Sequence, residues 1–282
     1  MELRHLRALA AIGDEGTITD AAIAVGISQP ALSRTLEQLE SLLGTRLVER
    51  TTRTLALTEP GQRLCQDAHR LLRQLDIALD AAKATKQPAL RLGFAWAALG
   101  ERTVPFLHTW REAHPETEIE IHRVNDPEAE LRRGTLDLAI TRTEPAPGSG
   151  LLAQPLFREA RVAAVAAGSE LGHQEATTLA QLADHPVVLC STAATTTPEL
   201  WADTAGLRTF EVSNTDEWLT TIALDDAIGV TAASTQQDHP HPGVRYLPIT
   251  DAEDITVNLL GPQEPTHPAS TLLVAHARRF LS

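Results

Sequence analysis

A stretch near the N-terminus, ISQPALSRTLEQLE, combines an apolar helical face with side chains that can bind nucleic acid. Its apolar residues recur every three or four positions, on one face of a helix: Leu32, Leu36, Leu39 and Leu43. The other face carries hydrogen-bonding side chains of the kind that contact base edges or phosphates: Ser28, Gln29, Ser33 and Arg34. Ser28 can cap this helix, and Pro30 suits its first turn. The stretch therefore predicts a helix that contacts DNA.

The distribution of charge along the chain is compatible with such a contact. The 282 residues carry a formal net charge of −13, and an acidic protein as a whole repels a polyanion. Residues 1–58, however, hold six arginines against seven acidic residues, and residues 59–86 hold five basic against four acidic residues. The N-terminal part is therefore neutral, and its arginines can still gather on one face. The whole acidic excess lies in residues 87–282.

A helix-turn-helix is predicted around the first stretch. An opening helix has its apolar face at Leu3, Leu6 and Ala10. Thr17 then offers an N-cap with Asp20 three residues later, and Gly26 is a natural left-handed end for the short helix that follows. The next helix begins at Ser28, so the two helices are joined by a turn of about three residues that contains glycine.

The segment that follows the second helix, TRLVERTTRTLALTEPG, predicts a two-stranded wing. It alternates β-prone residues around a threonine-rich turn. Arg50 and Arg53 lie along it, and an arginine on a wing can enter a minor groove or hold a phosphate. The alternative for both is a solvated charge or an ion pair with Glu49 or Glu59.

A long helical pattern runs from Glu59 to about Thr85, with apolar residues at heptad positions. These are Leu64, Ala68, Leu71, Leu75, Ala78 and Ala82. Such a helix either packs on its own body or pairs with a second copy. Its position between a small and a large domain favours pairing, with Leu64, Leu71 and Leu75 as dimer contacts. Pairing would deliver two helix-turn-helix units to a two-fold DNA site.

The remaining chain alternates strands and helices, which is typical of doubly wound α/β units. The first set begins with strand ALRLGFA, helix ERTVPFLHTWREAH and strand TEIEIHRV, and ends with strand LDLAITR. A second set starts at RVAAVAAG, includes a predicted helix at PELWADTAG, and is followed by a closing helix at TLLVAHARRFL. The pattern predicts two subdomains with a hinge and a cleft, the first at residues 89–161 and 265–282 and the second at 162–264.

Three segments give the chain a family resemblance: MELRHLRAL, GTITDAAIAVGISQPALSRTLEQLESLLGTRLVERTTRTLALTEPGQ and LRRGTLDLAITR. With the order of elements, they make the chain similar to the LysR-type transcriptional regulators over essentially its whole length. The resemblance implies an α+β chain: a winged helix-turn-helix domain at 1–58, a dimerisation helix at 59–86, and an effector-binding domain at 87–282. The last would resemble a periplasmic binding protein, with two hinged α/β subdomains.

The resemblance also implies the role of the chain and of particular residues. Members of this family are cytoplasmic, sequence-specific regulators that bind double-stranded DNA as homodimers, usually joined as homotetramers, and respond to a small-molecule effector. The residues matching Gln29, Pro30, Ser33 and Arg34 face the major groove, and the residue matching Arg53 reaches the DNA backbone or minor groove. The family often has a hydroxyl residue where Ala97 stands, so the effector pocket departs from the family pattern there.

Candidate effector contacts follow from the rule that ligands collect at the carboxyl ends of strands, beside helix N-termini. Four places supply them: Trp96, Ala97 and Ala98; Arg142 and Thr143; Ser191, Thr192, Thr195 and Thr196; and Asn214 and Thr215. Hydroxyls and N–H groups before a helix at Pro198 would suit an anion, and Arg142 would anchor its carboxylate. The alternative is that these residues are helix caps and strand-end packing, and that Trp96 belongs to the core.

The sequence offers little for other functions. It lacks GxSxG, HExxH, P-loop and CxxC patterns, and no cluster completes a metal site at His239 and His241. No signal peptide and no membrane-spanning run are evident. We therefore expect a cytoplasmic protein without catalysis, cofactor, metal or membrane partner. Three alternatives stay open: an enzyme fused to a DNA-binding domain, an effector-independent repressor, and a redox-responsive regulator using Cys190.

Overall fold

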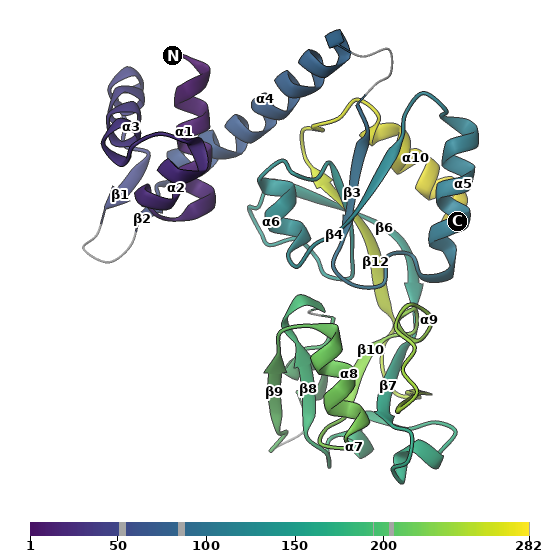
Figure 1. The fold of residues 1–282 in the computed structure, drawn as a ribbon. Coiled ribbons are helices and arrows are strands. Elements are labelled where there is room, and N and C mark those ends of the chain that lie inside the picture. The colour runs from purple at the N-terminus through teal and green to yellow at the C-terminus, as the bar shows by residue number, and fades with distance from the viewer. Residues whose placement is uncertain (51–54, 84–87, 194, 203–205, 282) are drawn as a thin grey trace.

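The computed structural model describes residues 1–50, 55–83, 88–193, 195–202 and 206–281. Figure 1 shows three parts along the chain: a small helical domain, a long helix that leads away from it, and two α/β subdomains. The order of these parts agrees with the order predicted from the sequence.

The N-terminal domain is a winged helix-turn-helix. Its elements are α1 (Leu3–Glu15), α2 (Ile18–Val25), α3 (Gln29–Leu43), β1 (Val48–Arg50) and β2 (Leu55–Leu57), and the two strands pair antiparallel. The Thr17 side chain accepts a hydrogen bond from the Asp20 amide at the start of α2, and Gly26 ends α2 in the left-handed region. The predicted apolar face of α3 is buried at Leu32, Leu36 and Leu39, whereas Leu43 is 45% exposed.

The long helix α4 (Glu59–Lys83) has its apolar stripe divided between two environments. Near its start, Leu64, Cys65 and Ala68 pack against the helix-turn-helix domain. Further along, Leu71 is 42% and Leu79 46% exposed. Leu64, one of the predicted dimer contacts, thus packs against the core of its own domain, which is the alternative that the sequence left open for this helix.

The first subdomain is a five-stranded sheet in the order β4-β3-β5-β12-β6. Its strands are β3 (Leu90–Phe94), β4 (Ile119–Arg123), β5 (Leu138–Thr141), β6 (Leu151–Glu159) and β12 (Ile255–Pro262). β3 is parallel to β4 and β5, and β12 is antiparallel to β5 and β6. The helices are α5 (Thr103–Ala113), α6 (Pro127–Arg132) and α10 (Ser270–Leu281), and α10 lies beside α5 (Figure 1).

The second subdomain contains the antiparallel sheet β10-β7-β11 and the parallel pair β8-β9. Its strands are β7 (Arg161–Ala166), β8 (Val187–Cys190), β9 (Thr209–Val212), β10 (Gly229–Ala232) and β11 (Val244–Pro248). Its helices are α7 (Leu179–Leu182), α8 (Thr215–Ala223) and α9 (Thr235–Asp238). The helix predicted at PELWADTAG is a single 3₁₀ turn, Pro198–Trp201, within the described residues there.

The chain crosses between the subdomains twice. It leaves the first sheet at the end of β6 and enters the second at Arg161, close to the predicted boundary. It returns before Ile255, because β12 is a strand of the first sheet, so the predicted boundary at residue 264 is wrong. Sequence reasoning assigned no strand to residues 151–159. In the structure these residues form β6, the edge strand that pairs with β12.

No helix among the described residues is long and apolar enough to cross a membrane.

Candidate nucleic-acid interface and effector cleft

The N-terminal half of α3 presents the predicted polar face to solvent. Gln29, Pro30 and Arg34 are exposed, and Ser33 is half-buried. The structure records no hydrogen bond from the side chains of Gln29, Ser33 or Arg34 to any described residue. Ser28 occupies the N-cap position of α3, but its side chain makes no capping hydrogen bond, which corrects the predicted cap role. The face is thus exposed polar surface with donors and acceptors available to a ligand.

Glu40 fixes the wing relative to α3, a role that sequence reasoning missed. One of its carboxylate oxygens, Oε1, accepts hydrogen bonds from the amides of Leu47 (2.8 Å) and Val48 (3.2 Å). The wing therefore starts from a fixed point on the helix. Arg50 ends β1, whereas Arg53 lies outside the described residues.

A cavity of about 300 Å³ lies between the two subdomains and gathers six of the predicted effector residues. These are Trp96, Arg142, Thr143, Ser191, Thr192 and Thr195. Asn125, Asp126 and Glu128 also line it and were not predicted. They lie at the carboxyl end of β4 and the start of α6, a strand end of the kind that supplied the other candidates.

Five predicted residues are not part of the cavity lining. Ala97 and Ala98 are buried and do not line it. The Thr196 hydroxyl donates to the Val230 carbonyl (2.6 Å). The Asn214 side chain accepts from the Glu217 amide as the N-cap of α8, and the Thr215 hydroxyl accepts from Arg123 Nη2 (3.0 Å). Thr196 and Asn214 thus have the structural roles given above as the alternative to effector binding. Thr196 packs at a strand end, and Asn214 caps a helix.

The Arg142 guanidinium forms hydrogen bonds with residues of both subdomains at the hinge. Its Nε donates to Glu159 (2.6 Å) and its Nη2 to the Ser234 hydroxyl (2.9 Å), and it also donates to the carbonyls of Ala97 and Ala98. Glu159 in turn accepts from the Ser234 amide (3.0 Å). The Arg142 side chain is only 2% exposed and that of Glu159 9%. The Arg142 guanidinium is therefore paired within the chain, although Arg142 lines the cavity, and its predicted role as a carboxylate anchor stays a prediction. We call Arg142, Glu159 and Ser234 the hinge clamp.

Trp96 also joins the two subdomains. It follows β3 of the first subdomain, but its ring lies edge-on to Trp218 of α8, with ring centroids 5.7 Å apart. Its Nε1 donates to the Thr235 hydroxyl of α9 (2.6 Å). The ring is 4% exposed and packs with Ala97 in a core of the second subdomain. Trp96 thus has the core role that was the alternative, while its rim borders the cavity.

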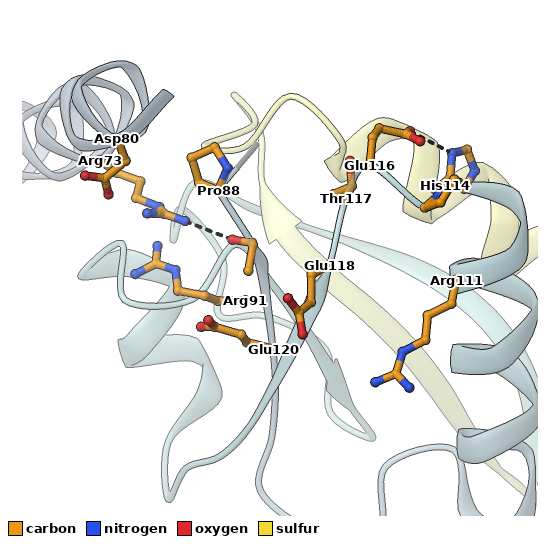
Figure 2. Close-up of a pocket in the computed structure, with 12 residues that line it drawn as sticks. Arg73, Asp80, Pro88, Arg91, Arg111, His114, Glu116, Thr117, Glu118 and Glu120 are labelled. Atoms are coloured by element: carbon orange, nitrogen blue, oxygen red, sulfur yellow. Dashed lines mark hydrogen bonds and ion pairs between the residues drawn. The ribbon is translucent and has the colours of Figure 1, made fainter. Parts of the chain in front are cut away.

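A second, larger crevice of about 710 Å³ lies where α4 passes the first subdomain (Figure 2). Figure 2 shows Arg73 of α4 with Arg91 beside it. Arg73 Nη2 donates to the Ala89 carbonyl (3.4 Å). Both arginines pair with the fully buried Asp137, at 3.0 and 3.2 Å, and Thr266 donates to the same carboxylate. Burial acts to raise the Asp137 pKa, but the arginine hydrogen bonds outweigh it and lower the pKa from 3.8 to about 2. This network joins α4 to the first subdomain.

A winged helix-turn-helix joined by a long helix to two hinged α/β subdomains defines a DNA-binding regulator with a sensing domain. Residues 3–62 match the family model of bacterial regulatory helix-turn-helix proteins of the lysR family, and residues 83–282 match the LysR substrate binding domain. The chain therefore belongs to the LysR family of transcriptional regulators, which bind DNA and carry an effector-binding domain.

Individual relatives agree with this assignment. The uncharacterized regulator YnfL of Escherichia coli is 34% identical over 67% of this chain, and the match spans 65% of YnfL. The transcriptional regulator BenM of Acinetobacter baylyi is 30% identical over 91% of this chain and 88% of its own. A crystal structure of full-length BenM superposes with a TM-score of 0.56 at 27% identity, over 99% of this chain and 96% of that chain. These relatives are named as regulators, not as enzymes.

Proposed function

We propose that this chain forms a homodimer that binds a two-fold operator through α3 and the wing of each copy. The observation that carries the proposal is the exposed face of α3, where Gln29, Ser33 and Arg34 have no partner among the described residues. A second helix of a helix-turn-helix with such a face fits the major groove, where arginine and glutamine read base edges. Arg50 and Arg53 would add contacts to phosphate or the minor groove.

The exposed part of α4 supports the dimer. Four residues of this part follow heptad spacing and lie away from the helix-turn-helix core: Leu71, Leu75, Ala78 and Ala82. Leu75 is half-buried, and the other three are exposed. Two antiparallel or parallel copies of this stripe would bury the leucines against each other. We expect dimers to join as tetramers, as the family resemblance implies, and the regulator to act in the cytoplasm, where the chromosome lies.

The proposed regulation is a shift between two packings of the subunits. A small molecule in the cavity between the subdomains acts only if it binds one cleft geometry more tightly than the other. The Arg73–Asp137 network offers a route by which a change in the first subdomain reaches α4. A moved α4 would alter the spacing of the two recognition helices on DNA and thereby the affinity or the bend.

Selection from genomic DNA tests the proposal. Purified protein is mixed with sheared DNA of the organism that encodes it, and retained fragments are sequenced. We expect a few fragments to be enriched and to share an inverted repeat, and the enrichment to be lost in a Gln29→Ala/Arg34→Ala variant. Uniform recovery of fragments by the wild-type protein would refute sequence-specific binding.

An effector-independent regulator is the second candidate, and the hinge clamp favours it. The hydrogen bonds of the hinge clamp all lie within the chain, between Arg142, Glu159 and Ser234. Operator binding that no cavity substitution alters, for example Thr195→Trp, would support this candidate. A redox role for Cys190, whose Sγ lies 3.2 Å from the Thr192 hydroxyl, would require Cys190→Ser to lose its response to peroxide in cells.

A further inference from the structure

The charged side chains that line the cavity between the subdomains are all engaged within the chain, as far as the described residues go. Arg142 is held in the hinge clamp by Glu159. Glu128 pairs with Arg132 at 2.7 Å and also accepts from the Ala146 amide. Asp126 caps α6 by accepting from the Ala129 amide at 2.9 Å. A charged ligand would therefore find its natural counter-charges already occupied.

Three uncharged side chains of the lining remain free for a ligand. The structure records no hydrogen bond from the side chains of Asn125, Thr143 or Thr195 to a described residue. An asparagine amide and two threonine hydroxyls supply both donors and acceptors. They come from three strand ends, β4, β5 and the segment after β8, so they converge from both subdomains.

The features that would have favoured an anion are missing from the described residues. The segment after Pro198 forms a 3₁₀ turn of four residues, which is too short to provide a helix end with a concentrated positive charge. Arg123 is engaged with Thr215. Arg161 is not part of the cavity lining. Its Nη1 donates to the Thr195 carbonyl (2.5 Å), and its buried Nε has no hydrogen-bond partner among the described residues.

We propose that the effector of this cavity is an uncharged molecule of the carboxamide class, and not a carboxylate. The inference rests on the proposed function of the cavity as an effector site. A carboxylate in this cavity would either remain unpaired or draw Arg142 away from Glu159, and an unpaired buried charge is strongly unfavourable. An amide or hydroxyl, in contrast, pairs with Asn125, Thr143 and Thr195 without disturbing the clamp.

Shape-matched pairs of probes test this proposal. Thermal unfolding and titration calorimetry are carried out on the full chain with nicotinamide against nicotinate, benzamide against benzoate, and malonamide against malonate, at equal ionic strength. We expect at least one carboxamide to raise the Tm and to bind at least about tenfold more tightly than its carboxylate, a difference of about 1.4 kcal/mol. A carboxylate that binds as well as its amide, or a panel without any amide response, would overturn the proposal.

Variants locate the response. Thr195→Val removes one free hydroxyl at nearly constant volume and should abolish the amide response. Thr256→Val is the matched control, because Thr256 is a half-buried threonine of β12 outside the cavity lining. Glu159→Gln releases Arg142 from its charge partner and should increase carboxylate affinity. An amide response that survives in Thr195→Val would place the ligand elsewhere and contradict the proposal.

Operator binding by the same preparations is measured in parallel, without probes. Specific binding of DNA together with failure of the amide panel would contradict only the effector class. Failure to bind any operator would contradict the proposed function itself.

Discussion

At the scale of single residues, Arg34 is the side chain on which the proposed DNA contact depends most. It is exposed on α3 and has no partner among the described residues. We expect Arg34→Ala to reduce the preference for operator over unrelated DNA by ~1–3 kcal/mol, the usual value of a good base contact. The ratio of the two dissociation constants measures this effect.

Arg111→Ala is the control for Arg34→Ala, because it removes the same charge from an exposed position on α5. It should leave the ratio unchanged. An Arg34→Ala protein with wild-type preference would mean that α3 does not read the operator through this residue.

Arg53 should behave differently from Arg34, because a wing arginine is expected to contact phosphate. Arg53→Ala should weaken binding to all DNA sequences alike and reduce the slope of log K against log salt by about 1. Titrations of operator and unrelated DNA at several salt concentrations test this. A loss confined to the operator would show that Arg53 contacts bases instead.

The cleft shows why residue roles are harder to predict than residue positions. Six predicted effector residues do line the cavity, because strand ends of α/β units can be found from sequence patterns. The partners of Arg142 could not be found in this way. Glu159 ends β6, where the chain first crosses between the subdomains, whereas Ser234 lies between β10 and α9 of the second subdomain. Their closeness to Arg142 depends on the tertiary fold. Pairing with them turns an apparent ligand anchor into part of the hinge.

At the scale of elements, the helix-turn-helix was predictable because its signals are local. Thr17 with Asp20 starts α2, Gly26 ends it, and the leucine spacing of α3 marks its buried face. Strand β6 could not be predicted from local signals, and neither could the return of the chain to the first sheet at β12. Both depend on pairing between residues 151–159 and 255–262, which are distant in sequence. The Pro198 segment contains a helix-start signal, but its described part makes only a 3₁₀ turn.

The divided stripe of α4 leads to a prediction about assembly. Leu71 and Leu75 lie on the part of the helix that does not cover its own domain. We expect Leu71→Asp/Leu75→Asp to dissociate the dimer, because charges in a coiled-coil seam are costly to bury. Light scattering after size-exclusion chromatography measures the mass.

Leu152→Asp, at another exposed leucine on β6, is the control for the α4 variant and should leave the mass unchanged. A dimer that persists in the α4 variant would place the interface on another surface.

At the scale of the whole molecule, Asp137 links α4 to the first subdomain, and its ionisation should affect stability. Its pKa of about 2 is below the ordinary 3.8, so the network stabilises the folded state fully above pH 3.8. This contribution, roughly 2 kcal/mol by the size of the shift, is lost as the pH falls from 3.8 to about 2. The free energy of unfolding, measured with denaturant for the wild type and Asp137→Asn at a series of pH values, isolates the contribution of Asp137.

The difference in unfolding free energy between these two proteins should be constant near neutral pH and shrink in acid. Asp137→Asn should also be less stable at pH 7 by about 3–5 kcal/mol, because Arg73 and Arg91 lose a buried partner. A difference that does not change with pH would show that Asp137 does not ionise within this network.

The central claim is that this acidic chain binds specific DNA through its neutral N-terminal part. Fluorescence anisotropy of the wild-type protein with labelled DNA from beside its own gene, against unrelated DNA of equal length, tests it most directly. We expect binding to the specific DNA to be at least ~10³-fold tighter than to the unrelated DNA. Both affinities should fall steeply between roughly 50 and 200 mM salt. Equal affinity for both DNAs at every salt concentration, also with fragments selected from the genome, would contradict it.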